Sequence, residues 1–176
     1  MPKSLRKTLG SVESPHIVAI MRLVETQSKA TVAAWAVTYA EEHYLPLYDA
    51  VCPGDARPAA ALAAARRWLA GEAKLPEAKR DILGCHEAAR QADGDPVAQA
   101  AARAVAQGAS AIHTPTHALG LAFYGAAAVA YATLGIQETD GAYDAIAAQE
   151  GARLVASLQA VAVPNEPNPT RVNWNC

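Results

Sequence analysis

The stretch His113–Gly135, HTPTHALGLAFYGAAAVAYATLG, decides the fold. No Asp, Glu, Lys or Arg occurs between Arg103 and Glu138, and the residues from Ala118 to Leu134 leave no polar stripe. A helix that is apolar on every side has to be surrounded. The length would also allow it to cross a bilayer, but its Gly, Tyr and Thr residues make it weakly hydrophobic. We therefore expect a helix over about 115–134 at the centre of a helical bundle.

The composition points to the same fold class. Hydrophobic residues make up 52% of the 176 residues, but aromatic residues only 6%. Roughly a quarter of the chain is alanine, far above ordinary usage. Alanine has the best helix propensity, and its small side chain lets helices approach closely. The sequence predicts one all-α domain, a compact bundle of about six to seven antiparallel helices.

The order of elements follows from proline, glycine and apolar spacing. Residues 1–27 are expected to be an N-terminal extension with a short helix from Pro15, residues 28–162 the bundle, and residues 163–176 an extended Pro/Asn-rich tail. Pro46 should kink or break the helix that starts near residue 29, because proline removes a hydrogen bond and clashes with the preceding turn. Val32, Trp35, Tyr39 and His43 lie on the apolar stripe of that helix.

Four further helices are expected around these two. Pro58 should open one that ends at a left-handed Gly71, and Trp68 should be buried on it as Trp35 is on its own helix. The others are expected over about 76–92, 97–113 and 139–161. Thr114 is the expected cap of the central helix, because a residue before proline leaves the helical region.

Charge and cysteine content exclude several classes of protein. The net charge is −2 and the basic residues are scattered, which argues against nucleic-acid binding. No apolar segment follows the basic start before Pro15, so a secretory signal is not expected. Cys52, Cys85 and Cys176 lack metal-site spacing and fit reduced thiols. We expect a cytoplasmic protein without a membrane partner.

The pair His113 and His117 suggests a metal site, since two histidines four apart on one helix can share a zinc ion. Cys85 or His86 could complete the ligand set. The expected corner at Pro115 argues against it, because the two rings then belong to different helices. His86, His113 and His117 are kept only as weak metal candidates, and His117 is expected to be a hydrogen-bonded structural residue.

Residue chemistry indicates neither a catalytic site nor a bound cofactor. Glu41, Glu42 and His43 are adjacent on a helix and diverge by about 100° each, so they cannot form a local acid–base pair. The same holds for Cys85 and His86. Glu41, Glu42, Asp49 and Asp55 do form an acidic edge, which could contact a partner.

Three segments resemble a known family when they are taken together. They are WAVTYAEEHYLPLYD (35–49), DARPAAALAAARRWLAGEAKLPEAK (55–79) and AARAVAQGASAIHTPTHALGLAFYGAAA (101–128). In this order they resemble the alanine-rich immunity proteins of bacterial polymorphic-toxin systems, the immunity-protein-5-like domain, over roughly residues 28–160.

The resemblance implies a binder that neutralises a cognate toxin domain and has no catalytic residues. The acidic edge would then be a contact surface for a basic toxin domain. The alternative from the residues alone is a small helical metal-dependent or cofactor-binding enzyme with a pocket near His86, His113 and His117. The sequence does not indicate the oligomeric state.

Overall fold

The computed structural model describes residues 5–175, and these residues form helices and loops without a strand. The helices are α1 (Pro15–Val24), α2 (Lys29–Tyr39), η1 (Ala40–Tyr44), α3 (Leu45–Val51), α4 (Arg57–Leu69), α5 (Leu75–Gln91), α6 (Pro96–Ser110), α7 (His117–Leu134) and α8 (Asp140–Val161). Because α2, η1 and α3 follow one another as one rod, the described chain has seven helical rods. The prediction of an all-α bundle is confirmed.

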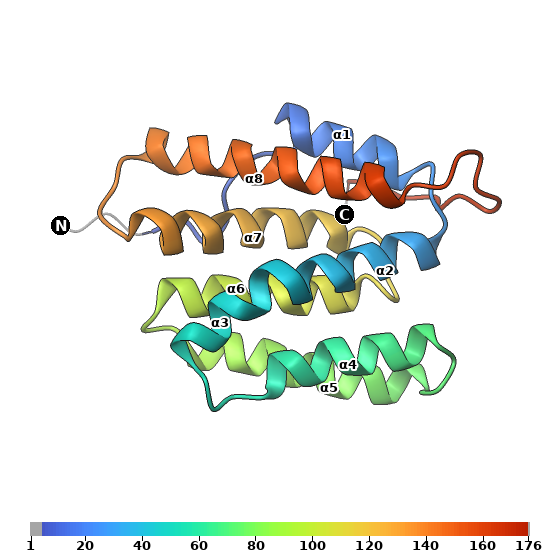
Figure 1. Cartoon of the computed structure of the whole chain (residues 1–176), viewed down its shortest axis with the longest axis horizontal. Helices are drawn as coiled ribbons and strands as arrows, with labels where there is room; N and C mark the ends of the chain where they lie inside the picture. The colour runs from blue at the N-terminus through green and yellow to red at the C-terminus, as the bar shows by residue number, and fades with distance from the viewer. Residues whose placement is uncertain (1–4, 176) are drawn as a thin grey trace.

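The helices lie in a stack of roughly parallel axes (Figure 1). α1 and α8 lie on one side, α7 comes next, and α4 and α5 lie on the far side. α6 lies between α7 and α5 and also contacts α2, η1, α3 and α4. The predicted central helix α7 therefore shares the middle of the bundle with α6.

Helix α7 begins at His117 and ends before Gly135, which has a left-handed φ of +75°. By length and composition alone it could cross a membrane, but half of it is buried inside the bundle, as in the core helix of a globular domain. Thr114 is not its cap, contrary to expectation. Thr116 occupies that position, and Thr114 instead accepts the His117 N–H through its carbonyl group.

Small residues set the close spacing of the rods. A Cβ atom at Gly108 of α6 would lie 2.9 Å from the carbonyl oxygen of Ala36, and one at Gly125 of α7 would lie 2.1 Å from the ring of Tyr44. Both distances are far below van der Waals contact. Glycine is thus required where α6 and α7 meet the rod formed by α2, η1 and α3.

Pro46 changes the helix type without ending the rod. In η1 the Leu45 N–H donates to the carbonyl group of Ala40, five residues earlier, which is the π-helical pattern. The wider turn precedes a proline that could not take part in regular α-helical bonding. Tyr44 before the proline and Tyr48 after it are both buried, whereas His43 is exposed and is not part of the inner stripe on which the sequence placed it.

The two tryptophans differ in burial. Trp35 is 4% exposed, as predicted, but Trp68 is only half-buried and packs against the edge of the core. Trp68 is in the last turn of α4, where the neighbouring helices no longer cover its outer side. The sequence predicts that both side chains are largely buried, and Trp68 is covered less completely than Trp35.

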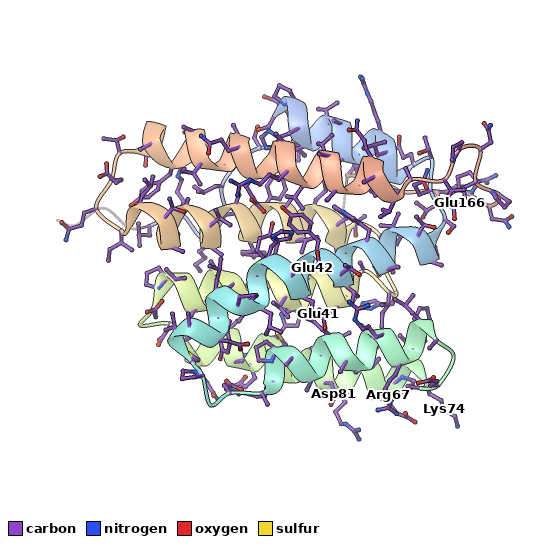
Figure 2. The ribbon with its side chains drawn as sticks, viewed as in Figure 1. Glu41, Glu42, Arg67, Lys74, Asp81 and Glu166 are labelled. Atoms are coloured by element: carbon purple, nitrogen blue, oxygen red, sulfur yellow. The ribbon has the colours of Figure 1, made fainter. Side chains whose placement is uncertain are left out.

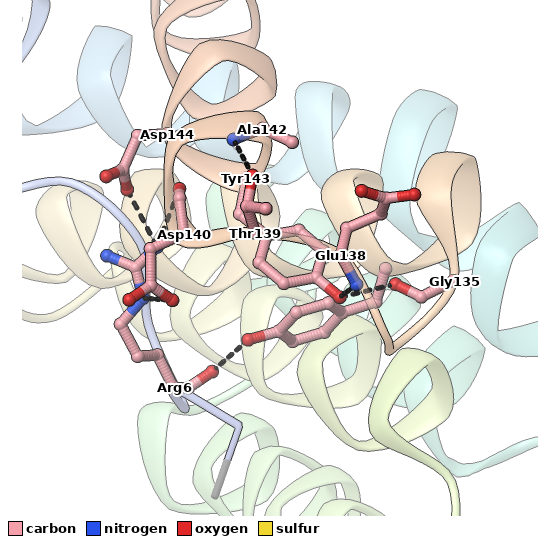
Figure 3. A network of polar contacts seen from close by, with 9 residues as sticks. Arg6, Gly135, Glu138, Thr139, Asp140, Ala142, Tyr143 and Asp144 are labelled. Carbon is pink, nitrogen blue, oxygen red and sulfur yellow. Dashed lines mark hydrogen bonds and ion pairs between the residues drawn. The ribbon is translucent and has the colours of Figure 1, made fainter. Parts of the chain in front are cut away.

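The N-terminal segment is held by hydrogen bonds to α7 and α8, next to the turn that joins them (Figure 3). Arg6 donates to Asp144 at 2.8 Å, and its carbonyl oxygen accepts the Tyr131 hydroxyl at 2.5 Å. The Tyr143 hydroxyl donates to the carbonyl oxygen of Gly135 at 2.9 Å, while Thr139 caps α8 by accepting the Ala142 N–H. Four separate contacts thus hold this end of the bundle.

Residues 163–174 form a strap across the loop between α1 and α2, with a turn at residues 164–165 and a bend at residues 167–168, where Asn165 and Asn168 have positive φ. Glu166 accepts the Ser28 N–H at 2.7 Å and the Thr31 hydroxyl at 2.6 Å, so its carboxylate caps α2. Figure 2 shows Glu166 beside the start of that helix. Gln27, 2% exposed, pairs through its side chain with the backbone of Val163. The strap adds the negative charge that a helix N-terminus favours.

The division into extension, bundle and tail at residues 27 and 162 stays a prediction. Ile17, Ile20 and Val24 of α1 belong to the same buried cluster as residues of α2 and α8. Cys176 lies outside the described residues.

We predict that Gly125→Ala lowers the free energy of unfolding by about 1–3 kcal/mol, because the new methyl group overlaps the ring of Tyr44. The matched control is Gly84→Ala in α5, where a Cβ atom meets nothing within 4 Å. This control should stabilise by up to about 1 kcal/mol through helix propensity. Urea unfolding of both variants measures the difference, and equal stabilities would contradict the close contact.

We also predict that Glu166→Gln lowers the melting temperature in a pH-dependent way. Hydrogen bonds from Thr31 and Ser28 lower the pKa of Glu166 in the folded state. A carboxylate with a lowered folded pKa stabilises above its unfolded pKa, and this contribution is lost as the pH falls. The difference from wild type should be full above about pH 5 and fade below about pH 4. Glu72→Gln, at an exposed carboxylate, is the control.

Candidate functional site

The predicted acidic edge runs along η1 and α3 and continues to the start of α4. Glu41 is paired with Arg66 of α4, and Asp55 accepts the Arg57 side chain at 2.8 Å. Arg57 and the Tyr48 hydroxyl hold the pKa of Asp55 well below its ordinary value. Both of these carboxylates therefore face a cation of their own chain, and their field is partly cancelled.

Glu42 and Asp49 present the more available charge. The Glu42 side chain is 63% exposed, and its nearest basic contact is the His43 ring at 4.0 Å. Asp49 is exposed on α3. In Figure 2, Glu41 points toward α4 while Glu42 lies on the other side of the rod. The structure thus divides the predicted edge, with Glu42 on the side that faces α8.

A groove of about 480 Å³ lies on that side, between α2 and the C-terminal half of α8. Trp35 and Tyr39 form part of its lining, and Glu42 and His43 stand at one end. The Trp35 indole N–H donates to Ser157 at 2.8 Å and ties the two helices together beneath it. Sequence reasoning missed this groove, because its walls are more than a hundred residues apart in the chain.

A buried carboxylate lies next to the groove. Glu150 of α8 is 2% exposed, and one of its oxygens accepts the hydroxyls of Tyr39 and Tyr44, each at 2.8 Å. Arg153 lies 3.5 Å from the other oxygen. Burial and the charge of Glu150 raise the pKa of both tyrosines, so their hydroxyls remain protonated donors. Tyr39 connects this network to the groove.

The π-helical turn allows both tyrosines to reach Glu150. Two residues five apart in an α-helix point about 140° away from each other, since each residue advances about 100°. The wider η1 turn reduces this angle, because it takes more residues to complete a circuit. Tyr39 and Tyr44 therefore face the same oxygen of Glu150 and pack edge to face, with ring centroids 5.5 Å apart.

Two of the three candidate histidines, His113 and His117, lie closer together than expected. The His113 and His117 rings are 5.3 Å apart, because two successive turns after α6 fold the chain back onto α7. Nδ1 of His117 lies 2.6 Å from the amide oxygen of Gln107, so the ring donates this hydrogen bond. Gly120 leaves room for Gln107, whose side chain a Cβ atom there would approach to 2.3 Å.

The histidines do not assemble a metal-ligand set. Among residues 5–175, no group of three or more His, Cys, Asp or Glu side chains is arranged to hold a metal ion. Cys85 donates to the carbonyl oxygen of Ala102, and burial raises its pKa to about 12, so the thiol stays protonated. Nδ1 of His113 is buried and lacks a hydrogen-bond partner within the described chain.

Comparison with protein families gives one finding. Residues 22–157 match the family described as "Imm-5 like putative immunity protein". The chain belongs to the Imm-5 like family. Comparison with curated proteins and with solved structures gives no significant match. The Imm-5 like match runs from the end of α1 to the last turn of α8, so it includes the acidic edge, His86, His113 and His117, and all of the groove lining except Ala160 and Val161.

Membership in the Imm-5 like family confirms the resemblance seen in the three sequence segments. A family of immunity proteins implies a protein partner in general, and it suggests a protein without enzymatic activity. The predicted contact residues Glu41, Glu42, Asp49 and Asp55 stay predictions.

We predict that His117 stays neutral to unusually low pH. Burial, with additions from His113 and His86, lowers its pKa to about 4. Between about pH 6.5 and pH 4 the unfolded chain binds a proton that the folded chain does not. The free energy of unfolding therefore decreases as the pH is lowered through this window. Proton NMR titration measures the pKa of the ring. A His117 pKa near 6.5 would contradict its burial.

Proposed function

We propose that the protein binds and blocks a cognate toxin domain of a bacterial polymorphic-toxin system, in the cytoplasm and without a catalytic step of its own. Blocking requires a complex that persists at cellular concentrations. Such interfaces bury about 1,200–2,000 Å² in total.

The observation that carries this proposal is the family match over residues 22–157. The charge distribution supports it. Glu42 and Asp49 are exposed on one rod, and exposed carboxylates accelerate association with a basic partner domain. A toxin domain that acts on nucleic acid would be basic for the same electrostatic reason, because it has to bind a phosphate backbone.

We predict that co-expression with the toxin domain encoded beside this chain restores growth, and that the two proteins purify as a complex. An unrelated toxin domain of similar charge is the control and should remain toxic. If the neighbouring toxin neither binds nor loses its toxicity, the proposed function is wrong.

The same assay separates this function from the enzymatic alternative. The convergence of His113 and His117, with the unpartnered Nδ1 of His113, is what favours a small-molecule site there. Under our proposal, His117→Ala retains rescue as long as it folds. Loss of rescue in a folded His117→Ala variant, together with turnover of a small substrate by the parent, would favour the enzyme.

A further inference from the structure

We propose that the groove between α2 and α8 is the part of the surface that holds the toxin, and that it receives an apolar side chain of the toxin with a neighbouring Lys or Arg side chain on Glu42. This inference rests on the proposed function and specifies its contact surface. It differs from the predicted acidic edge, because it selects one side of the α2–η1–α3 rod.

The side chains that form the walls of the groove are short and largely apolar. α2 contributes Thr31, Ala34 and Thr38, and α8 contributes Ser157, Ala160 and Val161. No charged residue occurs in the sequence from Ala30 to Ala40. A surface helix normally carries charge on its outer face, so an uncharged outer face is typical of a helix that another chain covers.

The apolar exposure extends past the end of α8. Val161 is 49% exposed and Val163 is 43% exposed, two of the six large hydrophobic side chains that are exposed in the described chain. Val161 lines the groove, and Val163 follows two residues later, where α8 leads into the strap. The volume of about 480 Å³ is enough for one or two side chains, so the groove would be the centre of a larger interface.

The floor is rigid, which suits it to be an anchor. Trp35 is fixed by its hydrogen bond to Ser157, and Tyr39 by its hydrogen bond to Glu150. Tryptophan and tyrosine are enriched among the residues that dominate binding energy, in part because little side-chain entropy is lost there. A side chain entering this groove would meet a surface that needs no rearrangement.

The charge distribution around the groove indicates which class of toxin side chain would bind there. Glu41 and Asp55 are paired with Arg66 and Arg57, whereas Glu42 at the end of the groove is 63% exposed and, among residues 5–175, is ion-paired with neither Lys nor Arg but lies 4.0 Å from His43. The nearby Arg153 is directed to the buried Glu150. An apolar group beside a basic group therefore complements both the apolar walls of the groove and the negative charge of Glu42.

The test compares two groove variants with matched controls, using the toxin domain encoded beside this chain as the probe. Ala34→Leu fills the groove, and Ala63→Leu adds the same group to the exposed face of α4. Glu42→Lys reverses the charge at the groove, and Glu72→Lys makes the same change on the turn between α4 and α5. Calorimetry measures the dissociation constants, and circular dichroism confirms that each variant melts as the parent does.

The proposal expects Ala34→Leu and Glu42→Lys each to weaken binding about ten-fold or more, and the controls less than about three-fold. The effect of Glu42→Lys should shrink at high salt, while that of Ala34→Leu should not. If Ala34→Leu unfolds, Val161→Lys with its exposed control Leu83→Lys takes its place.

Parental affinity in the folded groove variants would overturn the inference and leave the proposed function intact. Light scattering measures self-association of the chain. If the groove variants abolish self-association while toxin binding persists, the groove holds a second copy of the chain; this result too would overturn the inference and leave the proposed function intact. Failure of the wild-type chain to bind the toxin would overturn both.

Discussion

The buried carboxylate of Glu150 is the constraint on which the rest of the bundle depends. A charge at 2% exposure is costly unless donors surround it, and two tyrosine hydroxyls converge on one of its oxygens. Their convergence requires the π-helical turn ahead of Pro46, and the position of the Tyr44 ring requires a glycine at 125. One polar network thus fixes how the α2–η1–α3 rod, α7 and α8 sit against one another, in a core where alanine, which has little shape of its own, is the most frequent residue.

Much of the fold could be predicted because helix signals are local. Prolines at the first turn, the left-handed Gly71 and the uncharged run before Glu138 are each visible without knowing any neighbour. The consequence of Pro46 was only half predictable, since a kink, a break and a π-helical turn all answer the same missing hydrogen bond. Glu150 went unnoticed although it stands three residues after Ala147 and four before Leu154, on the apolar stripe of its helix. A carboxylate in such a position is a signal for a buried network.

The site was less predictable, because it is defined by pairs that are distant in the chain. The sequence identifies four carboxylates along one edge, but it does not show that two of them, Glu41 and Asp55, form ion pairs with Arg66 and Arg57. It indicates a corner at Pro115, yet the turns there bring the His113 and His117 rings together. The groove exists only where residues 31–43 meet residues 157–161. Periodicity assigns a residue to a face, and tertiary packing decides what that face meets.

The strap has a consequence for the order in which the protein is built. Glu166 caps a helix whose first residue precedes it by more than a hundred positions, and Gln27 finds its backbone partners in Val163 and Thr170. During synthesis α2 leaves the ribosome long before these partners exist. The hydrogen bonds that hold the start of α2, which forms one wall of the groove, can therefore form only after residue 170 has been translated. A nascent chain interrupted before the strap would contain the helices but lack these hydrogen bonds.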